Sequence, residues 1–329
     1  MPTLFSQDDI LQLTKTSTNE KKLGETIYTI HNDEDFFEAV KNCPAKYVVV
    51  GIPEDIGMRV NGEQGGTHNA FLPTIEAFVN IQENQFLSGK DILALGYLDY
   101  INTVNDFVAD DDEKGHYLVK QLDKDTTELI QFLVSVDKTP IVIGGGQNNA
   151  YGILKGLSEA KNQKVNAVNL DDKPDLNKTN TRHSTNAFSY ALEEGFLENY
   201  FIFGLHQNKT PQHLFDFIQN HVNIDYNFYE EIAIYKTTSF ENELQRAKQF
   251  ISQQLFGIEI DIDALQNFTN TTGISPEQAR RFVYYLAQNN NASYLHISES
   301  SPNQDNINSA GKFISCLIAD FIKAKRWVD

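Results

Sequence analysis

Short hydrophobic runs recur along the chain, and between them apolar residues fall at helical spacing. Most of the runs are continuously apolar rather than alternating with polar residues, which is typical of parallel strands covered by helices on both faces. The intervals between runs are long enough for crossover helices. The pattern therefore predicts a doubly wound α/β domain with strands at residues 47–52, 92–98, 140–144, 165–170, 200–205, 224–229, 256–262 and 294–298.

Two helices carry clear signals of their own. Ser275, Pro276 and Gln278 are typical of an N-cap, a first helical residue and a capping-box partner, so a helix is predicted to begin there. Residues 309–326 place isoleucine, leucine and phenylalanine at helical spacing. We expect this last segment to cover one face of the sheet.

Composition narrows the classes of function. The chain has 329 residues and a formal net charge of -18, and an acidic surface repels both phosphate backbones and anionic membranes. Nucleic acid and membrane are therefore not expected partners. Two cysteines without metal-type spacing, and an N-terminus unlike a signal peptide, favour a cytoplasmic protein. No linker or repeat divides the chain, so we expect one domain over residues 1–329, with residues 1–45 as an N-terminal extension packing on it.

Polar residues gather where the predicted strands end. In open α/β sheets, ligands bind beyond the carboxyl ends of the strands. A glycine turn presents Gln147 after the third strand, and the sequence NLDDKPDLN follows the fourth. The seventh strand ends in EIDIDAL and the eighth in HISESSP. The acids and the amine at these ends are Asp171, Asp172, Lys173, Asp175, Glu259, Asp261, Asp263 and Glu299.

Four of these aspartates are expected to share one site. Asp261 and Asp263 alternate, which puts both carboxylates on one face, and Asp171 and Asp175 can converge with them from a neighbouring strand end. Like charges a few ångströms apart destabilise one another unless a divalent metal, a lysine or arginine, or protons compensate them. The sequence therefore predicts a shared cationic site.

The ordered motifs GGGQ, NLDDKPD, EIDIDAL and HISESSP resemble those of the ureohydrolase superfamily, which comprises arginases, agmatinases and formimidoylglutamases. The corresponding family patterns are GG(G/D)H, DAHxD, SxDxD and a late glutamate before a proline. The segment at residues 51–67 resembles the family's GxPxDxGxxxNxGRxGA. RHSTNAFSYAL and the GLH at residues 204–206 look nearest to formimidoylglutamases. The resemblance implies a three-layer αβα, arginase-like fold with an eight-stranded, mostly parallel sheet, and a possible homo-oligomer.

The resemblance also implies a metal centre. In that family two manganese ions are held by two histidines and four aspartates, and they share a hydroxide that attacks an amidine or guanidine carbon. The four aspartates match Asp171, Asp175, Asp261 and Asp263. Both histidine positions differ, because Gln147 and Lys173 occupy them.

Charge decides what such a centre can hold. Four carboxylates carry -4; Lys173 alone leaves -3, and Lys173 with one divalent ion leaves -1. A protonated lysine has no lone pair and cannot ligate a metal, but it can replace part of the charge of one. We therefore expect one divalent metal (manganese, magnesium or calcium) on Asp171, Asp175 and Asp261 with the amide oxygen of Gln147, or no metal at all. A full dinuclear manganese centre is not expected.

The resemblance supplies the remaining site residues. Glu299 matches the family glutamate that binds the substrate's amidinium group, and Ser184 and Asn186 match polar positions at its amino-acid end. Asn177, at the end of NLDDKPDLN, is a further candidate for contacting the substrate. His183 is the best-placed imidazole for proton transfer and, with Asp263 and Glu299, completes the predicted catalytic set.

Several positions nearby are informative. His206 and His68 are alternative imidazoles, and Phe188 stands where the arginase pattern has a histidine, which argues against arginase. Thr185 replaces a glycine of the family pattern and Glu63 an arginine.

Two functional hypotheses follow. The first is a formimidoylglutamase-like hydrolase that converts N-formimidoyl-glutamate to glutamate and formamide at a mononuclear or metal-poor centre. The alternative is a catalytically silent pseudoenzyme that keeps the fold for ligand binding or assembly. In either case the expected ligand is a small amidine or an amino-acid-like molecule.

Overall fold

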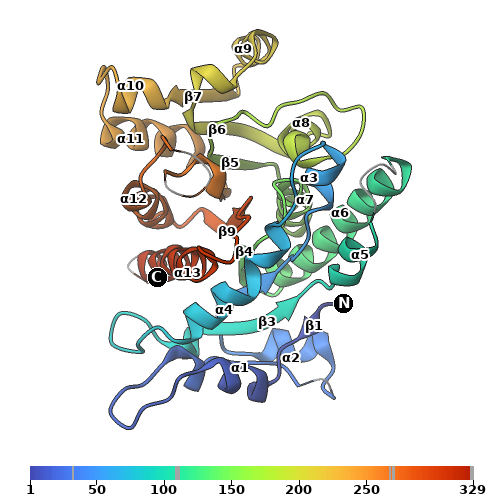
Figure 1. Ribbon diagram of the computed structural model, residues 1–329, viewed down its shortest axis with the longest axis vertical. Coiled ribbons are helices and arrows are strands. Elements are labelled where there is room, and N and C mark those ends of the chain that lie inside the picture. Colours follow the sequence, from blue (N-terminus) through green and yellow to red (C-terminus); the bar gives the residue numbers. More distant parts are fainter. Residues whose placement is uncertain (32, 108–111, 267, 269–270, 327–329) are drawn as a thin grey trace.

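The computed structural model describes residues 1–31, 33–107, 112–266, 268 and 271–326, and it is a three-layer α/β structure (Figure 1). Within those residues one sheet has the strand order β1-β3-β2-β4-β9-β8-β5-β6-β7, and every neighbouring pair is parallel except β1 with β3. The strands are β1 (Thr3–Leu4), β2 (Tyr47–Gly51), β3 (Ile92–Tyr97), β4 (Thr139–Ile143), β5 (Val165–Leu170), β6 (Leu197–Leu205), β7 (Ile224–Phe228), β8 (Phe256–Asp261) and β9 (Ala292–Ser298).

All eight predicted strands are present, so the fold class read from the sequence is confirmed. β6 begins three residues before the predicted start at residue 200, and β9 two residues before residue 294. The ninth strand, β1, was not predicted. It is two residues long, pairs with the edge of β3, and is too short to leave a hydrophobic pattern.

Helices cover both faces of the sheet (Figure 1). One core contains apolar residues of α1, α4, α11, α12 and α13, and the other contains those of α2, α5, α6, α7, α8 and α9. The helices are α1 (Gln7–Leu13), α2 (Phe36–Asn42), α3 (Ile56–Val60), α4 (Phe71–Val79), α5 (Ile101–Asp106), α6 (Asp112–Ser135), α7 (Asn149–Lys161), α8 (Ala187–Glu193), α9 (Gln212–Gln219), α10 (Tyr229–Ala233), α11 (Phe240–Ile251), α12 (Pro276–Ala287) and α13 (Ile307–Lys325).

The two helix predictions are confirmed. Ser275 caps α12, since its hydroxyl accepts the Gln278 N–H at 3.2 Å and its own N–H donates to the Gln278 side chain at 3.0 Å. The C-terminal helix α13 buries Ile314, Leu317 and Phe321 against the sheet. In the part of the chain that is described, no helix has the length and apolar character needed to cross a membrane.

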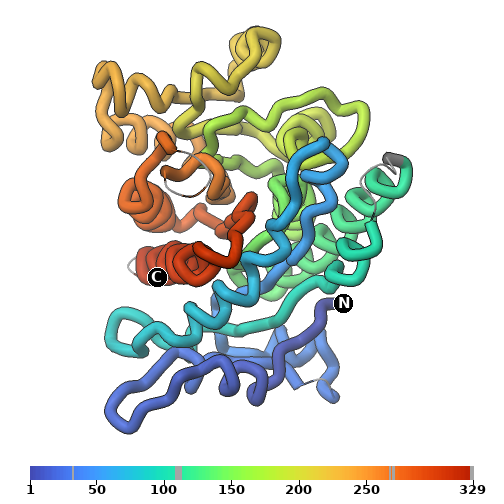
Figure 2. Tube along the Cα trace, in the orientation of Figure 1, coloured from blue at the N-terminus to red at the C-terminus, as the bar shows by residue number. Residues whose placement is uncertain are grey.

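The order of the strands in the sheet determines where the site lies. β4, β9, β8 and β5 are consecutive in the middle of the sheet, so their carboxyl ends meet at one edge. Asp261 is paired with Ser298, and Leu170 with Ile260, so Asp171 follows β5 at the level of Asp261. On the rim, α3 lies beside the turn Ser184–Asn186 that precedes α8, where the blue and green parts of the chain approach in Figure 2.

Candidate active site

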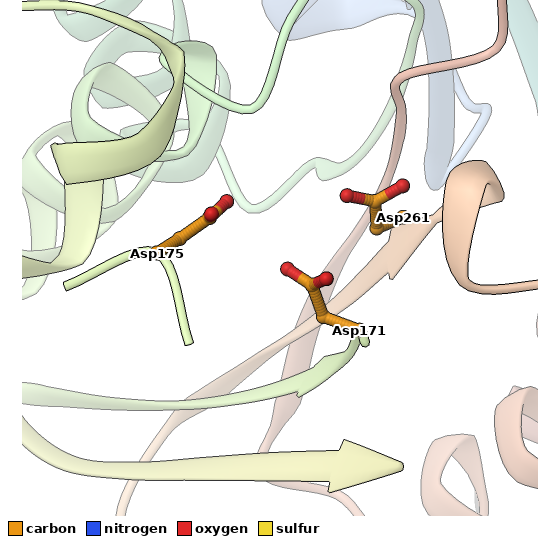
Figure 3. Close-up of side chains that lie close together, drawn as sticks. All are labelled: Asp171, Asp175 and Asp261. Carbon is orange, nitrogen blue, oxygen red and sulfur yellow. The ribbon is translucent and has the colours of Figure 1, made fainter. Parts of the chain in front are cut away.

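Three of the predicted acids converge. Asp171 directly follows β5, Asp261 ends β8, and Asp175 lies in the loop after Asp171; all three are buried. One carboxylate oxygen from each lies within 4.8 Å of the others, around a common space (Figure 3). Three carboxylate oxygens at this spacing are a donor set suited to one hard divalent cation.

Electrostatics favour a cation there. Burial raises the pKa of Asp171 to about 7, with a further rise from the Asp172 charge. Burial, and then the charge of Asp171, raises the pKa of Asp175 and of Asp261 well above the usual range. Ionising all three carboxylates without a compensating cation is therefore unfavourable, and the group must hold protons or a cation.

Lys173 is the cation nearest to this group in sequence. Its N–H donates to Asp171 Oδ1 at 2.8 Å, and its side chain is half-buried. Burial opposes its charge, yet the attraction of Asp261 and of the neighbouring carboxylates raises the pKa of Lys173 well above its usual value. Within the described residues, no carboxylate oxygen lies within 4.0 Å of its Nζ. The Lys173 ammonium group thus offsets the charge of the acids from a distance, and only its backbone N–H contacts one of them.

Gln147 is buried, and both its amide and its backbone N–H bond to the protein. Its Nε2 donates to Glu259 at 3.1 Å, and its amide oxygen accepts the hydroxyl of Ser298. Its backbone N–H donates to Glu299 Oε1 at 2.6 Å. The predicted role of Gln147 as a metal ligand would use the second lone pair of that amide oxygen, and it stays a prediction.

Glu299 and Asp175 share an unusual backbone conformation. Their φ angles are 57° and 49°, in the left-handed region that residues other than glycine seldom adopt. Such a residue costs on the order of 1 kcal/mol or more and persists only where its surroundings enforce it. Glu299 is held by its own N–H, which donates to Gly145 O at 3.1 Å, and by the Gln147 N–H. Backbone strain at two predicted site residues points to a functional constraint.

Comparison with known proteins identifies the family. The sequence model of the Arginase family matches residues 45–322. This chain belongs to the arginase family. It is 22% identical to a formimidoylglutamase of Staphylococcus aureus over 297 residues, which are 88% of this chain and 90% of the relative.

Two solved structures are similar to this arginase-family chain. The formimidoylglutamase of Bacillus subtilis matches with a TM-score of 0.73 and 16% identity, over 95% of this chain and 94% of that one. A formiminoglutamase of Trypanosoma cruzi with Mn²⁺ matches with a TM-score of 0.68 and 15% identity, over 89% of this chain and 98% of that one. The arginase-like fold and the similarity to formimidoylglutamases are thereby confirmed.

Asp263, the fourth expected aspartate ligand, lies beside the converging group. Its N–H donates to Asp261 Oδ1 at 2.6 Å, which places it in the turn after β8. Among the described residues, its carboxylate is not one of those within 4.8 Å. Its charge nevertheless raises the pKa of Asp261 and of Glu299, in both cases after the larger effect of burial. Its ligand and catalytic roles remain predictions.

Glu54 is a site residue that sequence reasoning missed. It is fully buried and accepts the Gly146 N–H at 2.9 Å and the Asn149 side-chain amide at 2.8 Å. Gly145, with φ of 78°, permits this approach, since a Cβ there would lie 2.0 Å from Asn149 Nδ2. Glu54 thus stabilises the glycine turn GGGQ, which corresponds to the arginase-family pattern GG(G/D)H. Its position just beyond β2 is the signal that could have found it.

The loop before α8 carries the predicted substrate residues Ser184, Asn186 and Asn177. Ser184 donates its hydroxyl to Glu63 at 3.0 Å, and Asn177 Nδ2 donates to Thr185 Oγ1 at 2.6 Å. Asn186 is buried; its Nδ2 donates to two backbone carbonyl groups, at 2.7 and 3.1 Å. These contacts weigh against a direct substrate role for Asn186 and Asn177, whereas the hydroxyl of Ser184 bonds only to the Glu63 side chain among the described residues. All three roles remain predictions.

Arg182, also missed, explains the engagement of Asn186. Its guanidinium forms a paired contact with buried Asp123 of α6, at 2.8 and 2.9 Å, and donates to Asn186 Oδ1 at 2.7 Å and to Asn148 O at 2.9 Å. It therefore ties the loop before α8 to the glycine turn. No local motif signals it, because Asp123 lies far away in the sequence.

The three candidate histidines lie in different environments. Burial, with the charges of Arg182 and His116, lowers the pKa of His183 to about 4, so its imidazole is neutral near pH 7. His68 Nδ1 lies 2.9 Å from Asp55, and His206 stacks on Tyr229 with ring centroids 4.6 Å apart. The catalytic role of His183 stays a prediction, because cations rather than the site carboxylates are its charged neighbours.

Proposed function

We propose that this chain is a formimidoylglutamase-like ureohydrolase that acts on a linear amidine at an altered centre holding one divalent cation. The observation that carries the proposal is the convergence of Asp171, Asp175 and Asp261, while the ammonium group of Lys173 forms no ion pair with them within 4.0 Å in the described part of the chain. The names of the relatives favour N-formimidoyl-glutamate, which water would cleave to glutamate and formamide. Carboxylate oxygens suit manganese, magnesium and calcium, and the T. cruzi neighbour with Mn²⁺ supports manganese.

The bound cation and three side chains would have separate roles in the proposed reaction. A bound cation would supply the positive charge that activates water near neutral pH. Glu299, held in place by the Gln147 N–H, binds the amidinium group of the substrate. Lys173 offsets the negative charge that remains on the carboxylates. His183 is neutral near pH 7, and its pKa of about 4 makes it a weak proton acceptor, so it serves as a hydrogen-bonding group.

The replacement of both family histidines favours a second candidate, a catalytically silent protein that binds ligands with this site. The side-chain amide of Gln147 already forms hydrogen bonds with Glu259 and Ser298. Lys173 lowers the cost of keeping the carboxylates without a metal. In this case the fold and the Glu299 subsite would bind an amidine without cleaving it.

Metal analysis combined with a formamide assay separates the two candidates. The hydrolase is expected to bind about one divalent ion per chain and to release formamide from N-formimidoyl-glutamate only with manganese, magnesium or calcium. Asp175→Asn is the matched control, since asparagine tolerates the left-handed conformation of residue 175 but is a weaker ligand. It should lose metal and formamide release together. Bound metal with no turnover at high protein concentration would identify the silent protein, and a metal-free protein would contradict the proposed centre.

Glu63 is expected to limit affinity for substrates that carry carboxylates. Its carboxylate accepts a hydrogen bond from the hydroxyl of Ser184. Its charge also contributes to raising the pKa of Asp175 and of Glu299, which indicates that Glu63 faces the site. We expect Glu63→Arg to lower KM for N-formimidoyl-glutamate about tenfold, because a guanidinium attracts the substrate's carboxylates. The control Glu63→Gln removes only the charge and should lower KM less. An unchanged or higher KM in both variants, measured in the formamide assay, would contradict this role.

A further inference from the structure

A group of buried polar side chains lies two residues deeper in the sheet than the acids. Glu259 precedes Asp261 by two positions on β8, so both point to the same face. Glu259 is paired in register with His296 of β9, as Asp261 is with Ser298. Glu259 and His296 are both completely buried. The proposed function gives this deeper layer no task.

Glu259 is the centre of this layer. Its Oε1 accepts the hydroxyl of Tyr294, and its Oε2 lies 2.6 Å from His296 Nδ1 and accepts Gln147 Nε2 at 3.1 Å. Ser298 donates its hydroxyl to the amide oxygen of Gln147. The amide is therefore fixed at both ends by strand residues.

These contacts also determine which way the amide of Gln147 points. Glu259 Oε2 accepts the Gln147 amide hydrogen, so a flipped amide would set its own oxygen against this acceptor and lose the bond. An unpaired buried acceptor costs about 1–3 kcal/mol. The orientation with Nε2 toward Glu259 is thus the stable one, and it directs the amide along the β8–β9 layer.

We propose that Glu259 is a positioning residue that anchors Gln147, and that Gln147 acts as a structural connector rather than a metal ligand. Through its backbone N–H, Gln147 then holds Glu299, which the proposed function uses to bind the amidinium group. Both positions depart from the family patterns, which have histidine at 147 and serine at 259. The part of the inference that concerns the metal rests on the proposed function, but the anchoring does not.

Exchanging the two groups tests the connection. In Gln147→Glu, two buried carboxylates would face each other. Adding Glu259→Gln restores a complementary pair. The new amide at 259 can donate to the carboxylate at 147 and, once the imidazole proton has moved to Nε2, to His296 Nδ1, while its oxygen still accepts from Tyr294. The carboxylate at 147 can still accept from Ser298. The double variant therefore keeps a donor facing an acceptor between residues 259 and 147, whereas Gln147→Glu alone does not.

The readouts are the melting temperature and the affinity for Mn²⁺ measured by electron paramagnetic resonance. We expect Gln147→Glu to lower Tm by about 5–10 °C, and the double variant to recover most of that loss, so that the two changes are not additive. We also expect Gln147→Glu to leave Mn²⁺ affinity within about threefold of the parent, because the carboxylate at 147 stays bonded to Ser298 instead of turning to the first metal.

Two results would overturn the proposal. If residue 147 is a ligand, a carboxylate there should strengthen Mn²⁺ binding about tenfold or more with little change in Tm. If the double variant loses as much stability as the two single variants lose together, Glu259 does not anchor residue 147. If Gln147→Glu alone does not fold, a folded double variant supports the anchoring, and an unfolded one opposes it. A parent that binds no Mn²⁺ removes the proposed centre but leaves the stability comparison intact.

Discussion

Replacing Gln147 and Lys173 together by histidine is expected to raise the manganese content of the purified protein from about one ion per chain to about two. The change removes the ammonium group that raises the cost of adding a second cation to the site. It also restores two neutral nitrogen ligands at the positions where family patterns have them. Four aspartates can then balance two divalent ions, and the double variant should release formamide at least about tenfold faster than the parent.

The deeper polar layer makes this reversion feasible. A metal-binding histidine usually donates its other ring N–H to a carboxylate, which fixes its orientation and strengthens its affinity about 10–100-fold. Glu259 already lies 3.1 Å from the side-chain nitrogen at position 147 and is the partner available for such a bond. An imidazole at 147 would therefore find its acceptor in place.

A matched control separates charge from ligation. Lys173→Met removes the ammonium group and keeps an unbranched side chain, but supplies no strong ligand for manganese. It should tighten the binding of the first ion by reducing repulsion, while the stoichiometry stays at about one. Metal content by inductively coupled plasma mass spectrometry distinguishes the variants. A double-histidine variant that still holds one ion would show that the site lacks space or geometry for a second.

The sequence predicted the scaffold and the acids because both depend on local rules. The parallel strands appear as continuous apolar runs, and the strand-end rule brings Asp171, Asp175 and Asp261 to one edge. The orientation of Gln147 could not be predicted, since it depends on Glu259 and Ser298, which lie more than a hundred residues away in the chain. The distance between the Lys173 ammonium group and the acids likewise depends on side-chain conformation, which sequence spacing does not determine.

The bonding of Asn186 illustrates the same difficulty. Its residue type suits a substrate contact equally well, and only the position of Arg182, set by Asp123 of α6, shows that its oxygen is engaged. Motif matching identifies which residues lie near a site, but tertiary contacts decide which of their hydrogen-bonding groups are free.

We expect Asp261→Asn to have two effects: the protein without metal becomes more stable, and the site no longer binds metal. Asp261 is buried beside Asp171, and their like charges raise each other's energy in the absence of a cation. Asparagine has the same shape, and its oxygen can still accept the Asp263 N–H that now bonds Asp261. We expect the metal-free variant to melt about 3–6 °C above the metal-free parent, and added manganese to raise the Tm of the parent only.

The pH dependence of the same melting experiment tests the cause. Because the pKa of folded Asp171, about 7, lies above its ordinary value, the folded protein binds more protons than the unfolded chain between about pH 4 and 7. Stability of the metal-free parent must therefore fall as pH rises through that window. Asp261→Asn should flatten the fall, since Asp171 then ionises more easily, whereas Asp216→Asn, a change on the exposed face of α9, should leave it unchanged. If Asp261→Asn instead lowers Tm at every pH, the carboxylates stabilise the metal-free fold, and a cation is not what their arrangement requires.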